Sequence, residues 1–250
     1  MFPIDQYAWT HRWRGHHPAE RAVLAGGMLL IAITAPPLAT APLVVLAMAG
    51  ATVAGAGVPL AAWLRVMTIP AGFLLLSLPF LAVSLDLTDG VALTVSAAGA
   101  WLAVAVGLRS LAAVSALAFL TLTTPVAELV PWLRRVGVPQ AVVEIALLIY
   151  RLLFILADCA DATRHAQEAR LGYSTTRRGI RSLGLLAGTL LTRALARTRR
   201  LEIGLAARGF EGELRVLASE RTLSRPRLAA VAALLFTVAA LGLTLDRALH

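Results

Sequence analysis

Apolar tracts long enough to cross a bilayer constrain the fold of this chain more than any other feature. They lie at residues 22–38, 42–62, 66–85, 91–124 and 228–245. A helix needs about 20 apolar residues to cross a hydrocarbon core of about 30 Å. Soluble domains rarely combine such tracts with 58% hydrophobic and only 15% charged residues. The sequence therefore predicts an all-α integral membrane protein with about five transmembrane helices.

The tract at residues 91–124 is too long for a single span. As one helix it would measure about 50 Å, against a core of about 30 Å. Gly107, Leu108, Arg109 and Ser110 interrupt it, and an acidic turn, 86–90, precedes it. We expect an interfacial or re-entrant piece at 91–107 followed by one span, and two full spans are the alternative.

The basic residues are all arginine, and their positions predict the topology. Seventeen of the 23 arginines lie between residues 128 and 227, and segment 1–21 contains three more, whereas the turn at 86–90 contains none. Basic residues concentrate on the cytoplasmic side of membrane proteins. We therefore expect a cytoplasmic N-terminal segment, 1–21, and a cytoplasmic module, 125–227. Helices 1–4 would lie in residues 22–124 and a last span in 228–250.

Composition also disfavours several function classes. A net charge of +9 suits nucleic-acid binding, but arginines beside apolar tracts indicate cytoplasmic loops and contact with the lipid bilayer instead. Because lysine is absent, the chain lacks the lysine-bearing phosphate loop of ATPases. No hydrolase or zinc-protease motif is present, and the lone Cys159 cannot form an internal disulfide. We expect no catalytic residues, no cofactor, no nucleic acid and no cleavable signal peptide.

The arginine-rich region is predicted to form long helices. Thr124 and Pro125 are typical of a helix start. Two long helical patterns follow at residues 140–170 and 179–208, separated by a loop at 171–176. The second pattern has an apolar stripe with arginines along one edge. Such a stripe suits a helix that lies against the membrane interface or against another protein.

The two long helices end in similar short motifs. The first is Ala169-Arg170-Leu171 and the second is Ala207-Arg208-Gly209, and glycine and an aromatic residue follow in each turn. This pairing resembles the transmembrane coupling subunit of energy-coupling-factor importers, the EcfT/CbiQ family, whose hallmark is a pair of Ala-Arg-Gly-like motifs on two cytoplasmic helices. The second motif matches fully, whereas Leu171 replaces the usual small third residue of the first. Residues 120–139 and 149–161 are also similar to the family, and residues 4–8 and 17–20 are similar to its cobalt/nickel branch, CbiQ.

The resemblance implies a non-catalytic subunit of an ATP-driven importer in a bacterial or archaeal cell membrane. Its implied partners are a dimer of ABC-type ATPase subunits, a substrate-binding membrane subunit for cobalt or nickel, and a small accessory membrane subunit. Cobalt uptake would serve cobalamin biosynthesis. Three alternatives stay open: a coupling subunit for a vitamin, an ordinary importer permease, and a membrane-embedded enzyme.

The chemistry of arginine supports the coupling role. A guanidinium at a helix end can form bidentate hydrogen bonds with carboxylates in a partner's groove. Arg170 and Arg208 would supply two such contacts, which is the number that a dimeric ATPase presents. The alternative is that both arginines only interact with the helix dipole, an effect of about 0.3–1 kcal/mol.

Two polar clusters raise the question of a metal site. Asp158, Asp161 and His165 share one helical face near Cys159, and His11, His16 and His17 lie near Asp5. We interpret the first cluster as neutralising nearby arginines and the second as anchoring the chain at the membrane interface. We therefore expect no metal-binding residues.

Overall fold

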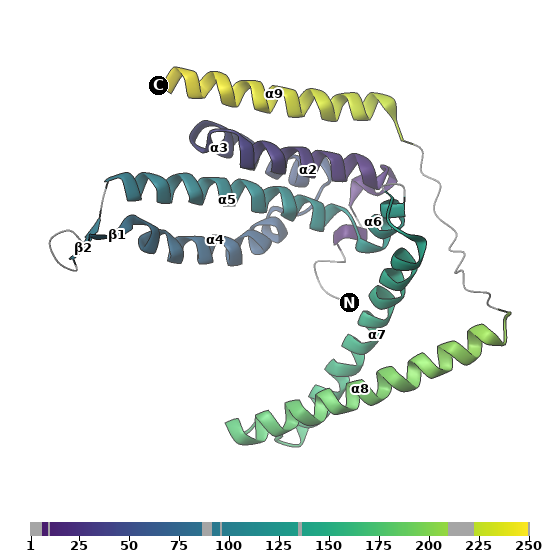
Figure 1. Cartoon of the computed structure of the whole chain (residues 1–250). Coiled ribbons are helices and arrows are strands. Elements are labelled where there is room, and N and C mark those ends of the chain that lie inside the picture. The colour runs from purple at the N-terminus through teal and green to yellow at the C-terminus, as the bar shows by residue number, and fades with distance from the viewer. Residues whose placement is uncertain are drawn as a thin grey trace. The chain divides into compact units, whose positions relative to one another are not determined.

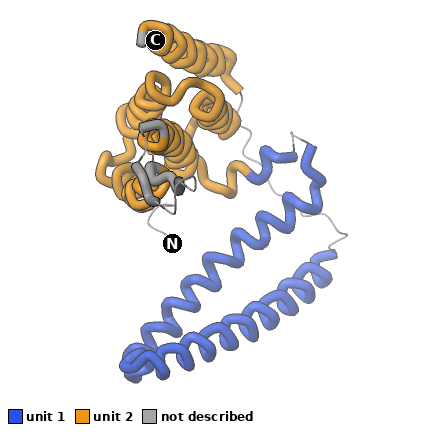
Figure 2. The backbone as a smooth tube through the Cα atoms, turned by 60° about the vertical axis from the view of Figure 1, so that its left-hand side comes forward, with its two compact units in different colours: residues 1, 130–219 blue, residues 2–129, 220–250 orange. Residues whose placement is uncertain are grey.

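The computed structural model describes residues 7–9, 11–86, 92–95, 97–134, 137–209 and 223–249. It divides into two compact units, which Figure 2 shows in different colours. The larger unit comprises residues 2–129 and 220–250, and the smaller one comprises residues 130–219 together with Met1.

The larger unit is a helical bundle (Figure 1). After a 3₁₀ turn, η1 (Arg12–Gly15), its main helices are α2 (Pro18–Thr34), α3 (Pro37–Gly50), α4 (Leu60–Ala82), α5 (Ala97–Thr123) and α9 (Arg225–Leu249). A π-helical turn, η2 (Ala51–Gly55), continues α3. Helix α5 packs against α2, α3 and α4, and α9 packs against α2 and α3.

The second apolar tract ends earlier than the sequence predicts. The expected helix over 42–62 stops at Gly55, and α4 begins at Leu60. Gly57 has a φ of 75°, a backbone conformation that glycine adopts readily, and Pro59 directly precedes α4. The break therefore falls at a Gly–Val–Pro sequence inside a continuous run of apolar residues.

The break expected at Gly107, between a piece at 91–107 and the following span, is not observed. Within the described residues of that stretch, 92–95 form a strand and 97–107 are the first part of α5. Strand β1 (Val83–Asp86) pairs antiparallel with β2 (Ala92–Val95), so a short hairpin connects α4 to α5. The hairpin removes the first residues of the long apolar tract from the helix. Gly107 and Arg109 are then accommodated inside one continuous helix.

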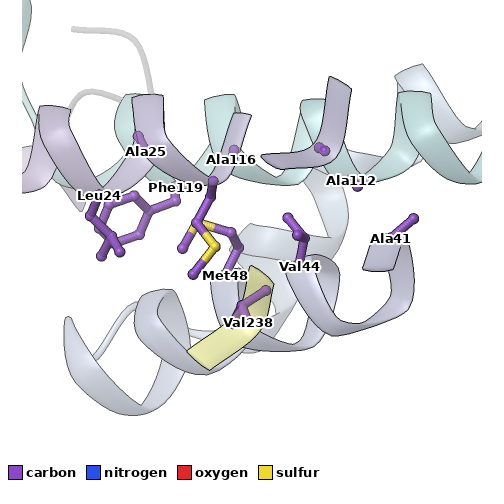
Figure 3. Packing of buried hydrophobic residues seen from close by; sticks show 11 residues of the cluster. Leu24, Ala25, Ala41, Val44, Met48, Ala112, Ala116, Phe119 and Val238 are labelled. Carbon is purple, nitrogen blue, oxygen red and sulfur yellow. The ribbon is translucent and has the colours of Figure 1, made fainter. Parts of the chain in front are cut away.

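The core of the bundle lies where α2, α3, α5 and α9 meet. Figure 3 shows Met48 between Phe119 and Val44, with Ala116 on α5 close to Met48 and Ala112 farther along α5. Both alanines are fully buried, and small side chains let membrane helices approach closely. The other buried members of the cluster are Leu24, Ala25, Met28, Ala32, Ala41, Val44 and Val238.

Four helical segments among the described residues are long and apolar enough to cross a membrane. They are Pro37–Gly55, Leu60–Leu81, Gly99–Thr123 and Arg225–Ala248. Helix α2, which contains most of the first predicted span, has 17 residues and measures about 26 Å. The prediction of an all-α membrane protein is confirmed, with the β1–β2 hairpin as an addition and α2 as a shorter fifth apolar helix.

The smaller unit consists mainly of two long helices. Helix α6 (Val126–Leu133) contains the boundary between the units, and α7 (Gln140–Ala169) and α8 (Thr176–Ala206) follow. In Figure 2 the two long helices of the smaller unit meet at a tight turn. Helix α8 begins three residues before the predicted start because the side chain of Thr175 caps it by accepting a hydrogen bond from the N–H of Arg178.

Candidate functional site

The first arginine motif forms the C-terminal cap of α7. Arg170 is the C-cap residue, and Leu171 follows with a φ of 56°. The N–H of Gly172 donates to the carbonyl of Gln167 (2.8 Å), and the N–H of Leu171 donates to that of Glu168 (2.9 Å). These two bonds define a Schellman motif, whose left-handed position is usually glycine. Leu171 therefore occupies a position that disfavours a leucine side chain.

The second motif repeats this backbone at the end of α8. Gly209 has a φ of 67°, and its N–H donates to the carbonyl of Ala206 (3.1 Å). The N–H of Arg208 donates to Leu205 (3.0 Å), as that of Arg170 donates to Gln167 (3.2 Å). The third residues of the two triplets, Leu171 and Gly209, therefore differ in residue type but both have a left-handed backbone. Both triplets share the bonds from their second and third residues and a left-handed third residue.

The turn after the first motif is fixed by side chains that the sequence analysis missed. Gln167 donates to the carbonyl of Ser182 (3.0 Å) and accepts a hydrogen bond from the Tyr173 hydroxyl (2.7 Å). Ser182 donates to the carbonyl of Gly172 (2.9 Å). A Cβ at Gly172 would lie 2.8 Å from the Ser182 hydroxyl, so only glycine fits there. Gly172 and Tyr173, which follow the first motif, were the sequence features that could have indicated this turn.

The two motifs lie far apart along α8. The first is held beside Ser182 by the turn, and the second ends the helix. At 1.5 Å per residue, the distance from Ser182 to Arg208 is about 40 Å. All six residues of the two triplets are exposed. Among the described residues, neither Arg170 nor Arg208 forms an ion pair, so both guanidinium groups are available to a partner.

A prediction follows from the strained backbone at Leu171. The left-handed conformation costs a non-glycine residue about 1–2 kcal/mol, so Leu171→Gly should stabilise the turn. The Gly172 amide donates to Gln167, and its hydrogen exchange should slow about fivefold for each 1 kcal/mol by which the turn is stabilised. The matched variant Leu171→Val should accelerate exchange, because a β-branched residue tolerates this conformation least. Unchanged exchange in Leu171→Gly would contradict the strain.

The residues of the two polar clusters serve different structural roles. His165 contacts the carbonyl of Asp161 (2.7 Å) on its own helix. His17 caps α2 by accepting a hydrogen bond from the N–H of Ala19, and His16 stacks on Trp13. Asp5 lies outside the described residues. In the described part of the chain, no group of three or more histidine, cysteine or acidic side chains is placed to hold a metal ion.

A buried arginine organises the end of the larger unit where α6 begins. Arg21, on α2, is 1% exposed and forms an ion pair with Glu128 of α6 (2.8 Å). It also donates to the carbonyl of Thr123, at the end of α5, and contacts the Nε2 atom of His11 (3.2 Å). Burial, with a contribution from Arg21, lowers the pKa of His11. Neutral His11 can accept a hydrogen bond from Arg21, and this cluster joins α2, α5 and α6.

Sequence reasoning treated Arg21 as a flanking charge and did not pair it with Glu128. The available signal was a cation directly before one apolar tract and an anion directly after another. Two arginines that lie within apolar stretches, Arg109 and Arg151, behave differently from Arg21. Arg109 donates to the carbonyl of Ala35 in the α2–α3 turn (3.4 Å), whereas Arg151 is exposed on α7.

The fold and the two motifs define a helical membrane protein with a separate unit of long helices that carries paired, exposed arginines. A family model described as "Cobalt transport protein", CbiQ, matches residues 10–218. The chain is 43% identical to the cobalt transport protein CbiQ of Rhodobacter capsulatus over 242 residues, which cover 97% of this chain and 98% of that protein. It is 32% identical to the CbiQ protein of Salmonella typhimurium over 85% of this chain and 99% of that protein. The chain belongs to the CbiQ family of cobalt transport proteins.

A further relative is described as a fused protein. A protein of Methanocorpusculum labreanum, described as a fused cobalt transport protein CbiMQ, is 34% identical over 135 residues. The match covers 54% of this chain but only 22% of that longer protein.

Proposed function

We propose that this chain is the coupling subunit of an ATP-driven cobalt importer. It would transmit conformational change from a dimer of ABC-type ATPase subunits to a substrate-binding membrane subunit. Nickel is the alternative ion for the same arrangement. The chain itself would neither hydrolyse ATP nor hold the transported ion.

The observation that carries this proposal is the matched pair of motifs. Arg170 and Arg208 lie at helix ends that share two backbone hydrogen bonds and a left-handed third residue, about 40 Å apart, and both are exposed. Two equivalent grooves on an ATPase dimer would accept two equivalent guanidinium groups, each by bidentate hydrogen bonds to carboxylates. A pair of arginines that only interacted with helix dipoles would not require matched backbones.

The apolar surface of the smaller unit supports a further partner. Val142, Ile145, Ile149 and Leu153 recur along one face of α7 and are 45–58% exposed. On α8, Leu191 and Leu195 are exposed to a similar degree. Contiguous apolar surface of this kind marks a protein or membrane contact. The relative described as a fused CbiMQ protein supports a membrane subunit as this partner, because its name joins a component M to Q.

Co-purification distinguishes this function from the alternatives. The tagged chain, expressed with candidate ATPase and membrane subunits, should recover both, and the complex should hydrolyse ATP. Metal analysis of the same sample, with and without the substrate-binding subunit, should place the ion with that subunit. A chain that is catalytically active alone and recovers no ATPase would instead be a membrane-embedded enzyme.

The proposed topology gives a separate prediction. Single cysteines at Ser174 and Asp89, each in a Cys159→Ser background, should react with an impermeant thiol reagent from opposite sides of the membrane. Arginine-rich segments are retained on the cytoplasmic side, so Ser174 should react only in inverted vesicles and Asp89 only in intact cells. Reaction of both positions from the same side would contradict the topology and, with it, the access of an ATPase to the motifs.

A further inference from the structure

A small cavity lies in the larger unit between α2, α9 and the turn before α2. Its volume is about 210 Å³. The inner wall is apolar and consists of Leu24 on α2 with Ala230, Val231 and Leu234 on α9. These three residues of α9 belong to a helix that is long and apolar enough to span the membrane. The inner wall is therefore suited to a hydrocarbon chain.

The cavity closes toward the middle of the bundle. A Cβ added to Gly27 would lie 2.5 Å from the side chain of Leu235, so α2 and α9 touch at that level. From Glu20 at the rim to Gly27 the distance along α2 is about 10 Å. The space between the two helices is thus a short wedge that is open near the N-terminal ends of α2 and α9.

Ionisable side chains form the rim of this wedge. His16, Glu20, Arg21 and Arg227 all line it. The charge of Arg21 is balanced by Glu128, whereas Arg227 is exposed and has no carboxylate ion-pair partner among the described residues. Burial lowers the pKa of His16, and the nearby Arg227 contributes. Arg227 is therefore the cationic side chain at the rim that can pair with an anionic group of a ligand.

Glu20 supplies a second, independent feature. It is 3% exposed, and one carboxylate oxygen accepts a hydrogen bond from the N–H of Ser224 at the start of α9 (2.9 Å). The other oxygen, Oε2, is buried and has no hydrogen-bond partner in the part of the chain that the structure describes. A buried carboxylate oxygen without a donor costs free energy. A ligand with an N–H or O–H group would remove that cost.

We propose that this wedge binds one phospholipid of the surrounding bilayer. The phosphate lies against Arg227, a hydrogen-bond donor of the headgroup reaches Glu20, and one acyl chain enters between α2 and α9. The ammonium of phosphatidylethanolamine and the glycerol hydroxyls of phosphatidylglycerol both supply such a donor, whereas the choline group of phosphatidylcholine does not.

The test uses the purified full-length chain. It is reconstituted into nanodiscs of phosphatidylethanolamine, phosphatidylglycerol and phosphatidylcholine in equal amounts, then released and analysed by native mass spectrometry. One lipid should remain bound, and the two donor-bearing lipids should exceed phosphatidylcholine about tenfold, as expected for one hydrogen bond to a charged group. Retention of either donor-bearing lipid alone supports the proposal and identifies the source of the donor.

Two pairs of variants make the test specific. Ala230→Phe fills the wedge and should abolish retention, whereas Ala229→Phe, one residue away and not in the wall, should leave it unchanged. Arg227→Ala should reduce retention, whereas Arg225→Ala should not. Glu20→Gln should bring retention of phosphatidylcholine close to that of the other two lipids. No retained lipid, equal retention in the two phenylalanine variants, or equal retention of all three lipids by the unmodified chain would overturn the proposal.

Discussion

Replacing Arg170 and Arg208 together by alanine should abolish recovery of the ATPase subunits with this chain. Each substitution would remove the cation from a carboxylate-lined groove, at a cost of roughly 2–5 kcal/mol, and this corresponds to a loss of about 30-fold or more in affinity per site. Either substitution alone should weaken assembly without abolishing it. The measurement is ATPase co-purification and cobalt uptake at matched expression.

The chemistry of the contact predicts how strongly each single substitution at Arg208 weakens assembly with the ATPase. Arg208→Glu should weaken assembly more than Arg208→Ala, because it adds repulsion, and Arg208→Lys should rescue only partly, because lysine lacks the planar fork. The matched control is the double variant Arg177→Ala, Arg199→Ala, which removes the same charge from two exposed positions outside the motifs. Equal loss in the control would mean that net charge alone, and not the motifs, holds the ATPase.

Removing Arg21 should have the largest effect on the stability of the larger unit. Arg21→Met leaves Glu128 without its cation and the carbonyl of Thr123 without this donor. Breaking a buried ion pair from one side costs about 3–5 kcal/mol. In a chain of this size, such a loss lowers the midpoint of thermal unfolding by on the order of 10 °C. Circular dichroism of the purified chain in detergent measures this midpoint.

A double-mutant cycle separates the ion pair from general packing. Arg21→Met with Glu128→Leu should recover most of the lost stability, because no uncompensated charge stays buried. Arg65→Met, at an exposed position on α4, serves as the control and should change the midpoint little. If Arg21→Met unfolds at the same temperature as Arg65→Met, the buried pair does not stabilise this unit.

The sequence predicted those features that depend on short stretches of chain. The apolar tracts indicated the membrane helices because length and hydropathy are local properties. The C-terminal ends of α7 and α8 lay within one or two residues of the predicted positions, whereas α8 begins three residues before its predicted start. The two triplets were picked out by residue type and spacing, but the left-handed backbone at Leu171, which disfavours a leucine side chain, was not predicted.

Features that depend on residues distant in the sequence were not predicted. The pairing of Val83 with Val95 removed the start of a long apolar tract from the helix that we expected. The partner of Arg21 lies 107 positions away, and nothing near Arg21 indicates that it is buried. Glu20 bonds the N–H of Ser224, at the start of α9, across a separation of 204 positions. Such contacts arise from the packing of the helices and produce no periodic pattern in the sequence.

Photo-crosslinking from the two motifs tests the coupling role most directly. A photoreactive amino acid replaces Ala169 or Ala207, the equivalent exposed first residues of the two triplets, and both arginines stay in place. In the assembled transporter, each position should give an adduct with one ATPase subunit, and a chain labelled at both should give an adduct with two. Leu191, exposed in the middle of α8, should give none with the ATPase. An ATPase that co-purifies yet forms no adduct from either motif would contradict the account.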